Sequence, residues 1–347
     1  MFVREIGFER FDGLTVKQVV RSVAKSGLGA AFPLRTEKFK EENMKILVTG
    51  SSGLVGTALV KALGGDGHML CRLMRPESAM SSEVKDGFNV EWNPATGELG
   101  GAAVGADAVV NLAGASIAGG RWTRQGKAVL RASRIDTTRA LVEALAKMNA
   151  RPSVLVSASA IGIYGDRGDE LLTEESGAGT DFLAGLAREW EAEALKAEAL
   201  GIRVVLARFG IILAQEGGAL AKMLLPFKLG AGGRLGSGQQ WMSWVTLEDV
   251  VGILRMAIEK VAMRGAVNVV APQPVKNAEF TKVLAKALHR PALFPAPAFA
   301  LRLALGEMAD ALLLSSQRVA PQKLQQTGFR FAHADLTTAI GAVLSAA

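Results

Sequence analysis

The sequence of 347 residues has few of the side chains from which common metal and redox sites are built. Its one cysteine, Cys71, excludes a disulfide framework, a zinc ribbon and an iron–sulfur cluster. The three histidines, His68, His289 and His333, are scattered and lack the spacing of metal ligands, so no metal site is expected.

Long runs of like charge are missing as well. The chain has 40 basic and 33 acidic residues, and the resulting net charge of +7 is mild for its length. Such a balance suits an anionic small ligand at least as well as a polyanion. A nucleic-acid partner is therefore not expected.

The sequence also lacks a continuous apolar stretch of about 18 residues, which a membrane-spanning helix would need. Residues 297–314 come nearest, but Arg302, Glu307 and Asp310 interrupt them. This segment predicts a pair of buried or amphipathic helices and no membrane span.

Residues 1–43 differ in character from the rest of the chain and form an N-terminal extension. They lack the apolar core of a signal peptide, and Glu5, Glu9 and Asp12 argue against a transit peptide. The extension is either a helical or flexible appendage or the product of an upstream start codon assigned in error. The cytoplasm is the default location, and an organelle matrix stays open if the extension is real.

From Met44 onward, short β-branched runs alternate with longer helical periodicity, which is typical of βαβ units and a parallel sheet. We predict an α/β, doubly wound Rossmann fold over residues 44–271, followed by a smaller, mostly helical subdomain over residues 272–347. The predicted strands are 45–49, 69–74, 108–112, 154–157 and 203–208. The predicted helices are 55–63, 133–148, 182–200 and 247–260.

A glycine-rich turn joins the first predicted strand to the first predicted helix, the context that a dinucleotide-binding fingerprint requires. Gly50 permits a tight turn, Gly53 lets backbone N–H groups approach a pyrophosphate, and Gly56 allows close packing of helix on strand. The positive end of the helix adds to the attraction for phosphate. The predicted cofactor contacts here are Gly50, Ser51, Gly53, Leu54, Val55 and Gly56.

The second strand ends in Met74 and Arg75, where an NAD site would favour an acidic residue for the adenosine ribose. A guanidinium at this place can pair with a 2′-phosphate, so NADP(H) is favoured over NAD(H). Glu77 keeps the alternative open. Another predicted strand runs into a turn of small residues, where Leu112, Ala113 and Gly114 are predicted to leave room for the cofactor.

The sequence from about Met44 to its end resembles the extended, epimerase-like short-chain dehydrogenases/reductases. More specifically, it resembles the atypical epimerase family, whose members carry a C-terminal domain of unknown function. The resemblance rests on segments such as Gly120-Arg-Trp-Thr, Trp190-Glu191, Leu225-Pro-Phe-Lys-Leu-Gly and Gly236-Ser-Gly-Gln-Gln-Trp-Met-Ser-Trp244. It implies a Rossmann domain that binds a nicotinamide cofactor.

Ordinary members of this superfamily use a Tyr-x-x-x-Lys pair, in which the lysine lowers the pKa of the tyrosine and the tyrosine transfers the proton. The chain has one tyrosine, Tyr164, and Gly168 stands four residues after it. Alignment on Trp190 places Leu183 and Ala187 where the pair would stand. Two apolar side chains cannot transfer a proton.

The resemblance leaves other candidates for catalysis and binding. Ser159 is similar to the catalytic serine of the superfamily, with Ser157 as the alternative, and Arg134 stands where a phosphate or ribose contact is implied. Tyr164 and Glu191 are the candidate substitutes for the missing proton donor. The glycine-rich segment 228–244, with Trp241 and Trp244, is predicted to contact substrate.

Two functions remain open. The first is an NADP(H)-dependent oxidoreductase or epimerase that acts on a small polar, sugar-like substrate through an unusual proton relay. The second is a nucleotide-binding sensor that has lost hydride chemistry. Leu183 and Ala187 favour the sensor, whereas Ser159 and the segment 228–244 favour the enzyme. Helices 133–148 and 182–200 are those through which related proteins form homodimers, so a homodimer is compatible with either function.

Overall fold

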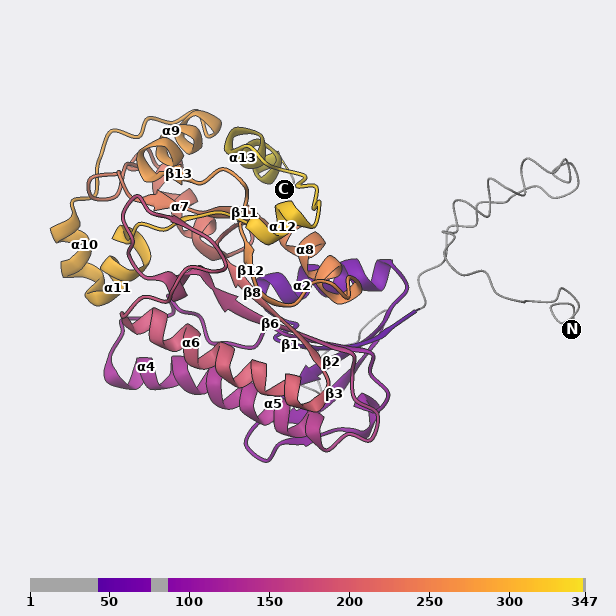
Figure 1. Cartoon of the computed structure of the whole chain (residues 1–347). Coiled ribbons are helices and arrows are strands. Elements are labelled where there is room, and N and C mark those ends of the chain that lie inside the picture. The colour runs from indigo at the N-terminus through magenta and orange to yellow at the C-terminus, as the bar shows by residue number, and fades with distance from the viewer. Residues whose placement is uncertain (1–42, 76–86, 346–347) are drawn as a thin grey trace, which may run out of the picture. The chain divides into compact units, whose positions relative to one another are not determined.

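A computed structural model describes residues 43–75 and 87–345, and its centre is an eight-stranded sheet (Figure 1). All neighbouring strands are parallel except the last pair, which is antiparallel. The described residues contain the predicted doubly wound arrangement, because the strand order reverses at β1. The order across the sheet is β12 (Gly265–Val269), β8 (Arg203–Phe209), β6 (Val154–Ala160), β5 (Ala108–Asn111), β1 (Lys45–Thr49), β2 (Met69–Met74), β3 (Gly87–Asn93) and β4 (Glu98–Leu99).

The five strands predicted from β-branched runs are all present. Strands β1 and β2 have the predicted bounds, β5 ends one residue earlier, and β6 and β8 continue further. Strands β3 and β12 were not predicted. Their sequences, GFNVEWN and GAVNV, place glycine and asparagine among the apolar residues and so lack a continuous apolar run.

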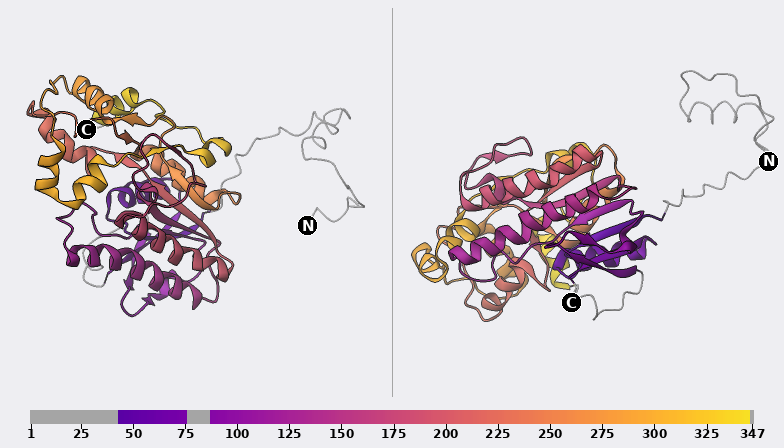
Figure 2. Two further views of the ribbon diagram at one scale, coloured as in Figure 1. Left: turned by 60° about the vertical axis from the view of Figure 1, so that its left-hand side comes forward. Right: turned by 90° about the horizontal axis from the view of Figure 1, so that it is seen from below.

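The central strands are buried on both faces, as parallel strands between two helical layers must be. Ile46 and Val48 pack in the core that contains α2 (Leu54–Gly65) and α8 (Leu247–Glu259). Leu47 packs in the core on the other face, with α5 (Thr137–Ala146) and the end of α6 (Phe182–Leu195). Figures 1 and 2 show α5 and α6 side by side across the sheet.

The predicted helix 133–148 is broken into unlike parts. Helix α4 (Arg124–Arg131) passes into a π-helical segment, Ala132–Asp136, which leads into α5. A π-helical turn inserts an extra residue into a helix and is common at functional sites. Similarly, α6 ends at Leu195 and continues as a 3₁₀ segment to Leu200, so the predicted helix 182–200 is only partly α-helical.

A second core lies outside the large sheet. Its apolar residues come from α7 (Gly218–Lys228), α9 (Asn277–Ala287), α13 (Leu336–Ser345) and the strands near Trp244. The core therefore joins residues on both sides of the predicted boundary at 272. The further elements outside the large sheet are the helices α10 (Ala298–Leu305), α11 (Glu307–Ala309) and α12 (Gln322–Gln326) and the short strands β7 (Leu171–Leu172), β9 (Ile211–Leu213), β10 (Trp241–Met242), β11 (Trp244–Thr246), β13 (Val275–Lys276) and β14 (Arg318–Val319).

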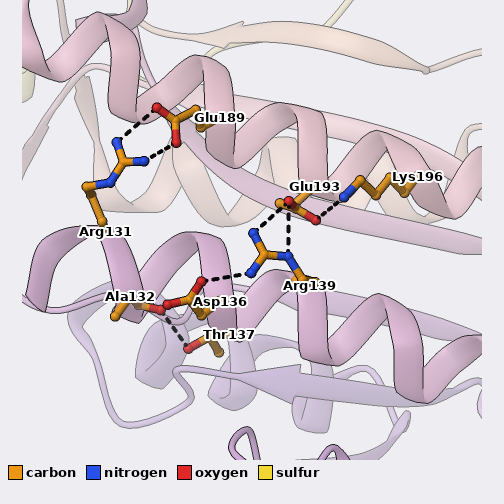
Figure 3. Close-up of polar contacts among 8 residues, drawn as sticks. All are labelled: Arg131, Ala132, Asp136, Thr137, Arg139, Glu189, Glu193 and Lys196. Atoms are coloured by element: carbon orange, nitrogen blue, oxygen red, sulfur yellow. Dashed lines mark hydrogen bonds and ion pairs between the residues drawn. The ribbon is translucent and has the colours of Figure 1, made fainter. Parts of the chain in front are cut away.

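Ion pairs connect α4, α5 and α6 on the outside of the sheet (Figure 3). Arg131 at the end of α4 forms a bidentate pair with Glu189 on α6. Arg139 on α5 contacts Glu193 at 2.9 Å, and Lys196 contacts the other oxygen of Glu193 at 2.7 Å. Ion pairs within one chain thus hold α4, α5 and α6 together. Of the helices described, none is both long and apolar enough to cross a membrane.

Candidate functional site

A cavity of about 1010 Å³ opens at the carboxyl ends of β1, β5 and β6. This is the edge of an open α/β sheet at which ligands bind. Ten of the predicted site residues line the cavity: Gly50, Gly53, Leu54, Val55, Gly56, Leu112, Ala113, Gly114, Arg134 and Ser159. The cavity is at the upper end of the usual range for a small-molecule site, about 300–1,000 Å³, which leaves room for a cofactor and a small substrate.

The three glycines of the first turn have different geometries. Gly50 has a φ of +65°, and a Cβ there would lie 2.5 Å from Leu112 O. A Cβ at Gly56 would collide with Gly50 O, so only glycine allows the helix to pack this closely. Gly53 is the N-cap of α2 and provides no side-chain cap, which leaves the first N–H groups of the helix free for an anion. These features fit a dinucleotide phosphate.

Three predicted cofactor contacts do not line the cavity. Ser51 is buried, accepts a hydrogen bond from Arg72 Nε at 3.2 Å and donates to Met74 Sδ at 3.5 Å. Arg75 is exposed just beyond β2, at the same edge of the sheet. Glu77, the residue that kept NAD open, lies outside the described residues.

Arg134 lies in the π-helical segment and faces the cavity. Its guanidinium stacks 5.3 Å from the Trp190 ring and donates to Ala115 O at 3.0 Å. Gly114 makes this possible, because a Cβ there would lie 3.2 Å from Arg134 Cζ. Burial lowers the pKa of Arg134, and within the described chain no carboxylate forms an ion pair with it. A half-buried cation without an acidic partner suits an anionic ligand.

Sequence reasoning missed a second cation on the cavity wall. Lys222 on α7 reaches across to Ala118 O, in the loop after β5, at a distance of 2.9 Å. The start of α7 lies close to α2, since a Cβ at Gly217 or at Gly218 would lie 3.5 Å from the Leu54 side chain. No motif marks Lys222, because its position depends on how α7 folds over the cavity.

Leu183 and Ala187, which the sequence predicts at the positions of the tyrosine and lysine, both line the cavity. Helix α6 therefore presents two aliphatic side chains to the cavity at these positions.

Ser159 at the end of β6 is a polar group on the cavity wall, and its Oγ lies 2.6 Å from Glu191 Oε1. Both side chains are buried, with Ser159 2% and Glu191 7% exposed, and of the two only Ser159 lines the cavity. Arg208 donates to both oxygens of Glu191, with Nε and Nη2 each at 2.8 Å. Glu191 accepts all of these hydrogen bonds, and in the contact of 2.6 Å Ser159 Oγ is the donor and Glu191 Oε1 the acceptor.

Arg208 was not predicted as a site residue, although a charged residue at the end of an apolar strand was a visible signal. It also donates to the Tyr164 hydroxyl at 2.9 Å, and Tyr164 in turn donates to Asn268 Oδ1 at 2.7 Å. Burial alone lowers the pKa of Arg208, but hydrogen bonding to Glu191 and its charge outweigh this effect and raise it. The result is one buried polar chain from Ser159 to Asn268.

The candidate proton donor Tyr164 is not brought to the cavity. Its side chain is 0% exposed and packs among the apolar residues Ile161, Leu172 and Val319. Burial raises the pKa of its hydroxyl, and the opposing effect of Arg208 does not cancel the shift. Tyr164 contacts Arg208 and does not line the cavity, so direct proton donation by Tyr164 stays an untested prediction. Glu191 likewise contacts the cavity wall through its hydrogen bond with Ser159.

The alternative serine, Ser157, is fully buried and accepts a hydrogen bond from Asn111 Nδ2 at 3.1 Å. Asn111 also accepts from the Thr49 hydroxyl at 2.8 Å. Ser157 thus ties β6 to β5 and β1 inside the sheet. It does not line the cavity, whereas Ser159 does.

The predicted substrate segment 228–244 reaches the cavity through only some of its side chains. Leu235, Gln240 and Trp241 line it, together with small residues at 231–233. Trp244 is fully buried and donates to Gln273 O at 3.0 Å, so it is part of the second core.

Comparison with known proteins agrees with this architecture. Residues 46–270 match the model of the NAD dependent epimerase/dehydratase family, and residues 296–343 match a domain of unknown function. An epimerase family protein of Mycobacterium bovis is 43% identical over 300 residues, covering 86% of this chain and 97% of the relative. A chloroplastic epimerase family protein of Arabidopsis thaliana is 39% identical over 315 residues, covering 88% of each chain.

A solved structure has the same fold. The crystal structure of human epimerase family protein SDR39U1 with NADPH superimposes with a TM-score of 0.77 at 31% sequence identity. The match covers 87% of this chain and 99% of the human chain. With its Rossmann sheet, its glycine-rich turn and its C-terminal helical region, the chain belongs to the NAD dependent epimerase/dehydratase family, in the branch of atypical short-chain dehydrogenases/reductases that carries this C-terminal domain.

Proposed function

We propose that the chain is an NADP(H)-dependent oxidoreductase in which Ser159 handles the reacting group. The observation that carries the proposal is the 2.6 Å hydrogen bond between Ser159, on the cavity wall, and the buried Glu191. It gives the site a proton-accepting group although Leu183 and Ala187 replace the usual pair. An epimerase reaction would use the same residues, because it also begins with hydride transfer.

Residues on both sides of the cavity would hold the cofactor. The free N–H groups at the start of α2 and the guanidinium of Arg134 suit its phosphates. Arg75, together with Arg72 three residues earlier, favours NADP(H) over NAD(H) as the cofactor, because a guanidinium at the end of β2 can pair with a 2′-phosphate. The NADPH in the related human structure supports the same choice.

When bound, the nicotinamide would accept a hydride from the substrate carbon or return one to it. In the oxidation of an alcohol, the substrate O–H bond breaks and its proton joins Ser159 Oγ. The proton of Ser159 passes at the same time to Glu191 Oε1 and is finally lost to water. The carbon loses hydride and becomes a carbonyl carbon, and reduction takes the same path backwards.

Arg208 and Tyr164 act as positioning residues. Arg208 fixes the Glu191 carboxylate through two hydrogen bonds, and Tyr164 and Asn268 fix Arg208. The carboxylate thus keeps one oxygen aimed at Ser159 before substrate arrives, which is the arrangement that preorganised catalysis requires.

The second candidate is a nucleotide-binding sensor without hydride chemistry. The aliphatic pair Leu183 and Ala187 favours it, because the cofactor site is retained where the usual proton donor is lost. The two candidates differ in turnover and agree in cofactor binding.

We further propose that the protein works in the cytoplasm, which commonly supplies the cofactor for NADP(H)-dependent reactions.

A homodimer through α5 and α6 is compatible with this activity. Size-exclusion chromatography of wild type and of a Glu143→Arg variant on the exposed side of α5 tests the dimer. A dimer through this helix is expected to weaken in the variant.

The test of the cofactor site is a fluorescence titration of the protein with NADPH and with NADH, for wild type and for Arg75→Ala. We expect NADPH to bind more tightly than NADH, and Arg75→Ala to weaken NADPH binding by about tenfold while leaving NADH unchanged. Failure to bind either cofactor would exclude both candidate functions. Tight binding without turnover of any alcohol or carbonyl compound would favour the sensor.

A further inference from the structure

The part of the cavity lined by α7 and by the segments after it carries mostly aliphatic, aromatic and thioether side chains. We call six of these residues the apolar wall. They come from α7, from the loop after it and from the segment after α10. They are Met223, Phe227, Leu235, Met308, Leu312 and Leu313.

The amide side chains beside the apolar wall use their N–H groups within the protein. Gln240 is 7% exposed, and its Nε2 donates to Leu235 O and Leu313 O at 3.1 and 2.9 Å. Gln317 Nε2 donates to Gly165 O at 3.1 Å. Asn277 Nδ2 donates to Met242 Sδ at 3.3 Å, and its Oδ1 accepts from the Leu235 N–H group at 2.8 Å. These amides shape the wall and leave few donors for the several hydroxyls of a sugar.

Charged side chains are concentrated elsewhere. Among the described residues that line the cavity, the charged ones are Arg134 and Lys222. Both contact carbonyls of the loop 115–118, which comes after β5 on the cofactor side. A diphosphate on the substrate would need its own cations, since a buried anion without a partner is strongly unfavourable.

The segments that build the wall also carry exposed apolar residues. Phe294 lines the cavity and is 64% exposed, which places an aromatic ring between solvent and the interior. Leu225 on α7, Leu229 directly after α7 and Phe299 on α10 are 65–74% exposed. Exposed apolar residues gathered around a binding site favour an apolar ligand.

The direction of the Ser159 hydrogen bond limits which group of a substrate can bind beside it. Because its proton is donated to Glu191, Ser159 offers lone pairs to the cavity and binds a hydrogen-bond donor such as an alcohol. We propose that the substrate is an uncharged alcohol on a largely apolar skeleton, interconverted with its ketone, and not a sugar-like or nucleotide-linked compound. The interconversion of alcohol and ketone rests on the proposed oxidoreductase function. The apolar class of the ligand rests on the apolar wall alone.

Binding of a neutral fluorescent naphthyl ketone to the NADPH-loaded protein tests the class of ligand without requiring turnover. We expect 1-(2-naphthyl)ethanol to displace this probe and UDP-glucose not to displace it. Leu312→Glu and Met223→Glu should each weaken probe binding by about tenfold or more, because they put a charge in the apolar wall. Leu303→Glu is the matched control, since Leu303 is 79% exposed and does not line the cavity.

NADPH titration and thermal unfolding show whether each variant is folded. The two substitutions in the apolar wall lie on different helices, so the test stays decisive if one variant does not fold. Displacement by UDP-glucose, or lack of probe binding by protein that binds NADPH, would overturn the inference and leave the cofactor site intact. If NADPH does not bind, the oxidoreductase function fails. The same probe titration without cofactor then decides whether the cavity takes apolar ligands.

Discussion

Ser159 directs its hydroxyl proton at Glu191 across 2.6 Å and keeps only lone pairs for the cavity. This polarity is the reverse of that of a serine that donates to a substrate oxygen. It results from Arg208, whose two hydrogen bonds keep Glu191 an acceptor. The direction of one hydrogen bond is thus decided by a residue that never reaches the cavity.

Replacement of Ser159 tests its role directly. We expect Ser159→Ala to lower turnover by about 10²–10⁴-fold with little change in NADPH affinity, because the proton acceptor at the reacting oxygen is lost. Ser157→Ala is the matched control two residues earlier on the same strand. It should retain turnover and lose about 1 kcal/mol of stability, since it removes a partner of Asn111. Equal activity losses in the two variants would contradict the assignment of Ser159.

The pair Glu191–Arg208 should behave as a buried ion pair in unfolding experiments. Arg208→Met leaves the Glu191 carboxylate buried without a cation and should cost about 3–5 kcal/mol of unfolding free energy. The double variant Arg208→Met/Glu191→Leu should recover much of this loss, because neither charge then remains. Urea denaturation of the four proteins of this cycle gives the coupling free energy, and additive losses would show that the two side chains act independently.

Arg134 should contribute to cofactor affinity through its charge. We expect Arg134→Ala to weaken NADPH binding by about tenfold or more, and Arg134→Lys to restore part of the loss, since a lysine keeps the charge and loses the planar fork. Arg131→Ala is the control, because Arg131 lies three residues earlier and is paired with Glu189 outside the sheet. Fluorescence titration measures all three, and equal effects at the two arginines would rule out a specific contact.

Tyr164 can be observed without interference because the chain has no other tyrosine. Burial raises the pKa of its hydroxyl above the ordinary value of about 10. Ultraviolet absorbance of the folded protein should therefore show no phenolate until the pH is well above 10 or the protein unfolds. Because the pKa of Tyr164 is higher in the folded than in the unfolded protein, its protonated hydroxyl stabilises the fold fully at a pH below the unfolded pKa. This contribution to the free energy of unfolding is lost as the pH rises through the folded pKa.

The Tyr164→Phe variant separates a positioning role from proton transfer. It should lose about 1–3 kcal/mol of stability, because Asn268 Oδ1 and Arg208 each lose a buried partner. NADPH affinity should stay unchanged, and some turnover should remain. Loss of turnover as large as that of Ser159→Ala, with the fold intact, would restore Tyr164 as the proton donor.

The ion pairs of Figure 3 predict a dependence of stability on acid. Burial raises the pKa of Glu193, but hydrogen bonds from Lys196 and Arg139 outweigh it, so the folded pKa lies below the ordinary value of about 4.3. Its stabilisation is therefore present above that value and is lost as the pH falls through the folded pKa. Glu193→Gln should cost about 0.5–1 kcal/mol at neutral pH and nothing in strong acid. A constant difference between pH 3 and pH 7, measured by urea unfolding at both values, would be inconsistent with this origin.

The sheet was predictable where a strand is one continuous apolar run. Residues 45–49 and 69–74 were predicted to the residue, because both faces of a central parallel strand are buried. Strands β3 and β12 were missed, because asparagine and glycine interrupt their apolar residues and only neighbouring strands make them strands. Pairing across the sheet is a tertiary effect that local pattern does not contain.

The site was predictable where a turn fixes the backbone, and poorly predictable where side chains meet across the sheet. Nearly all contacts predicted around Gly50 and Leu112 line the cavity, since a glycine fingerprint specifies local geometry. Arg208 and Lys222 were missed. Their roles depend on contacts with residues 17 and 104 positions away, which no local motif records.

The buried polar chain behind Ser159 has a consequence for the order in which the protein is made. Asn268 donates to Ala320 O, and Glu174 accepts from the N–H groups of Asn268 and Lys323. A nascent chain that emerges from the ribosome can form the glycine-rich turn early, because Gly50 needs only the strands near it. The groups that hold Arg208 and Glu191 in place come together only after residues beyond 320 have been synthesised. The glycine-rich end of the cavity can therefore be shaped during translation, whereas the polar chain behind Ser159 is complete only after residues 320–323 have been synthesised.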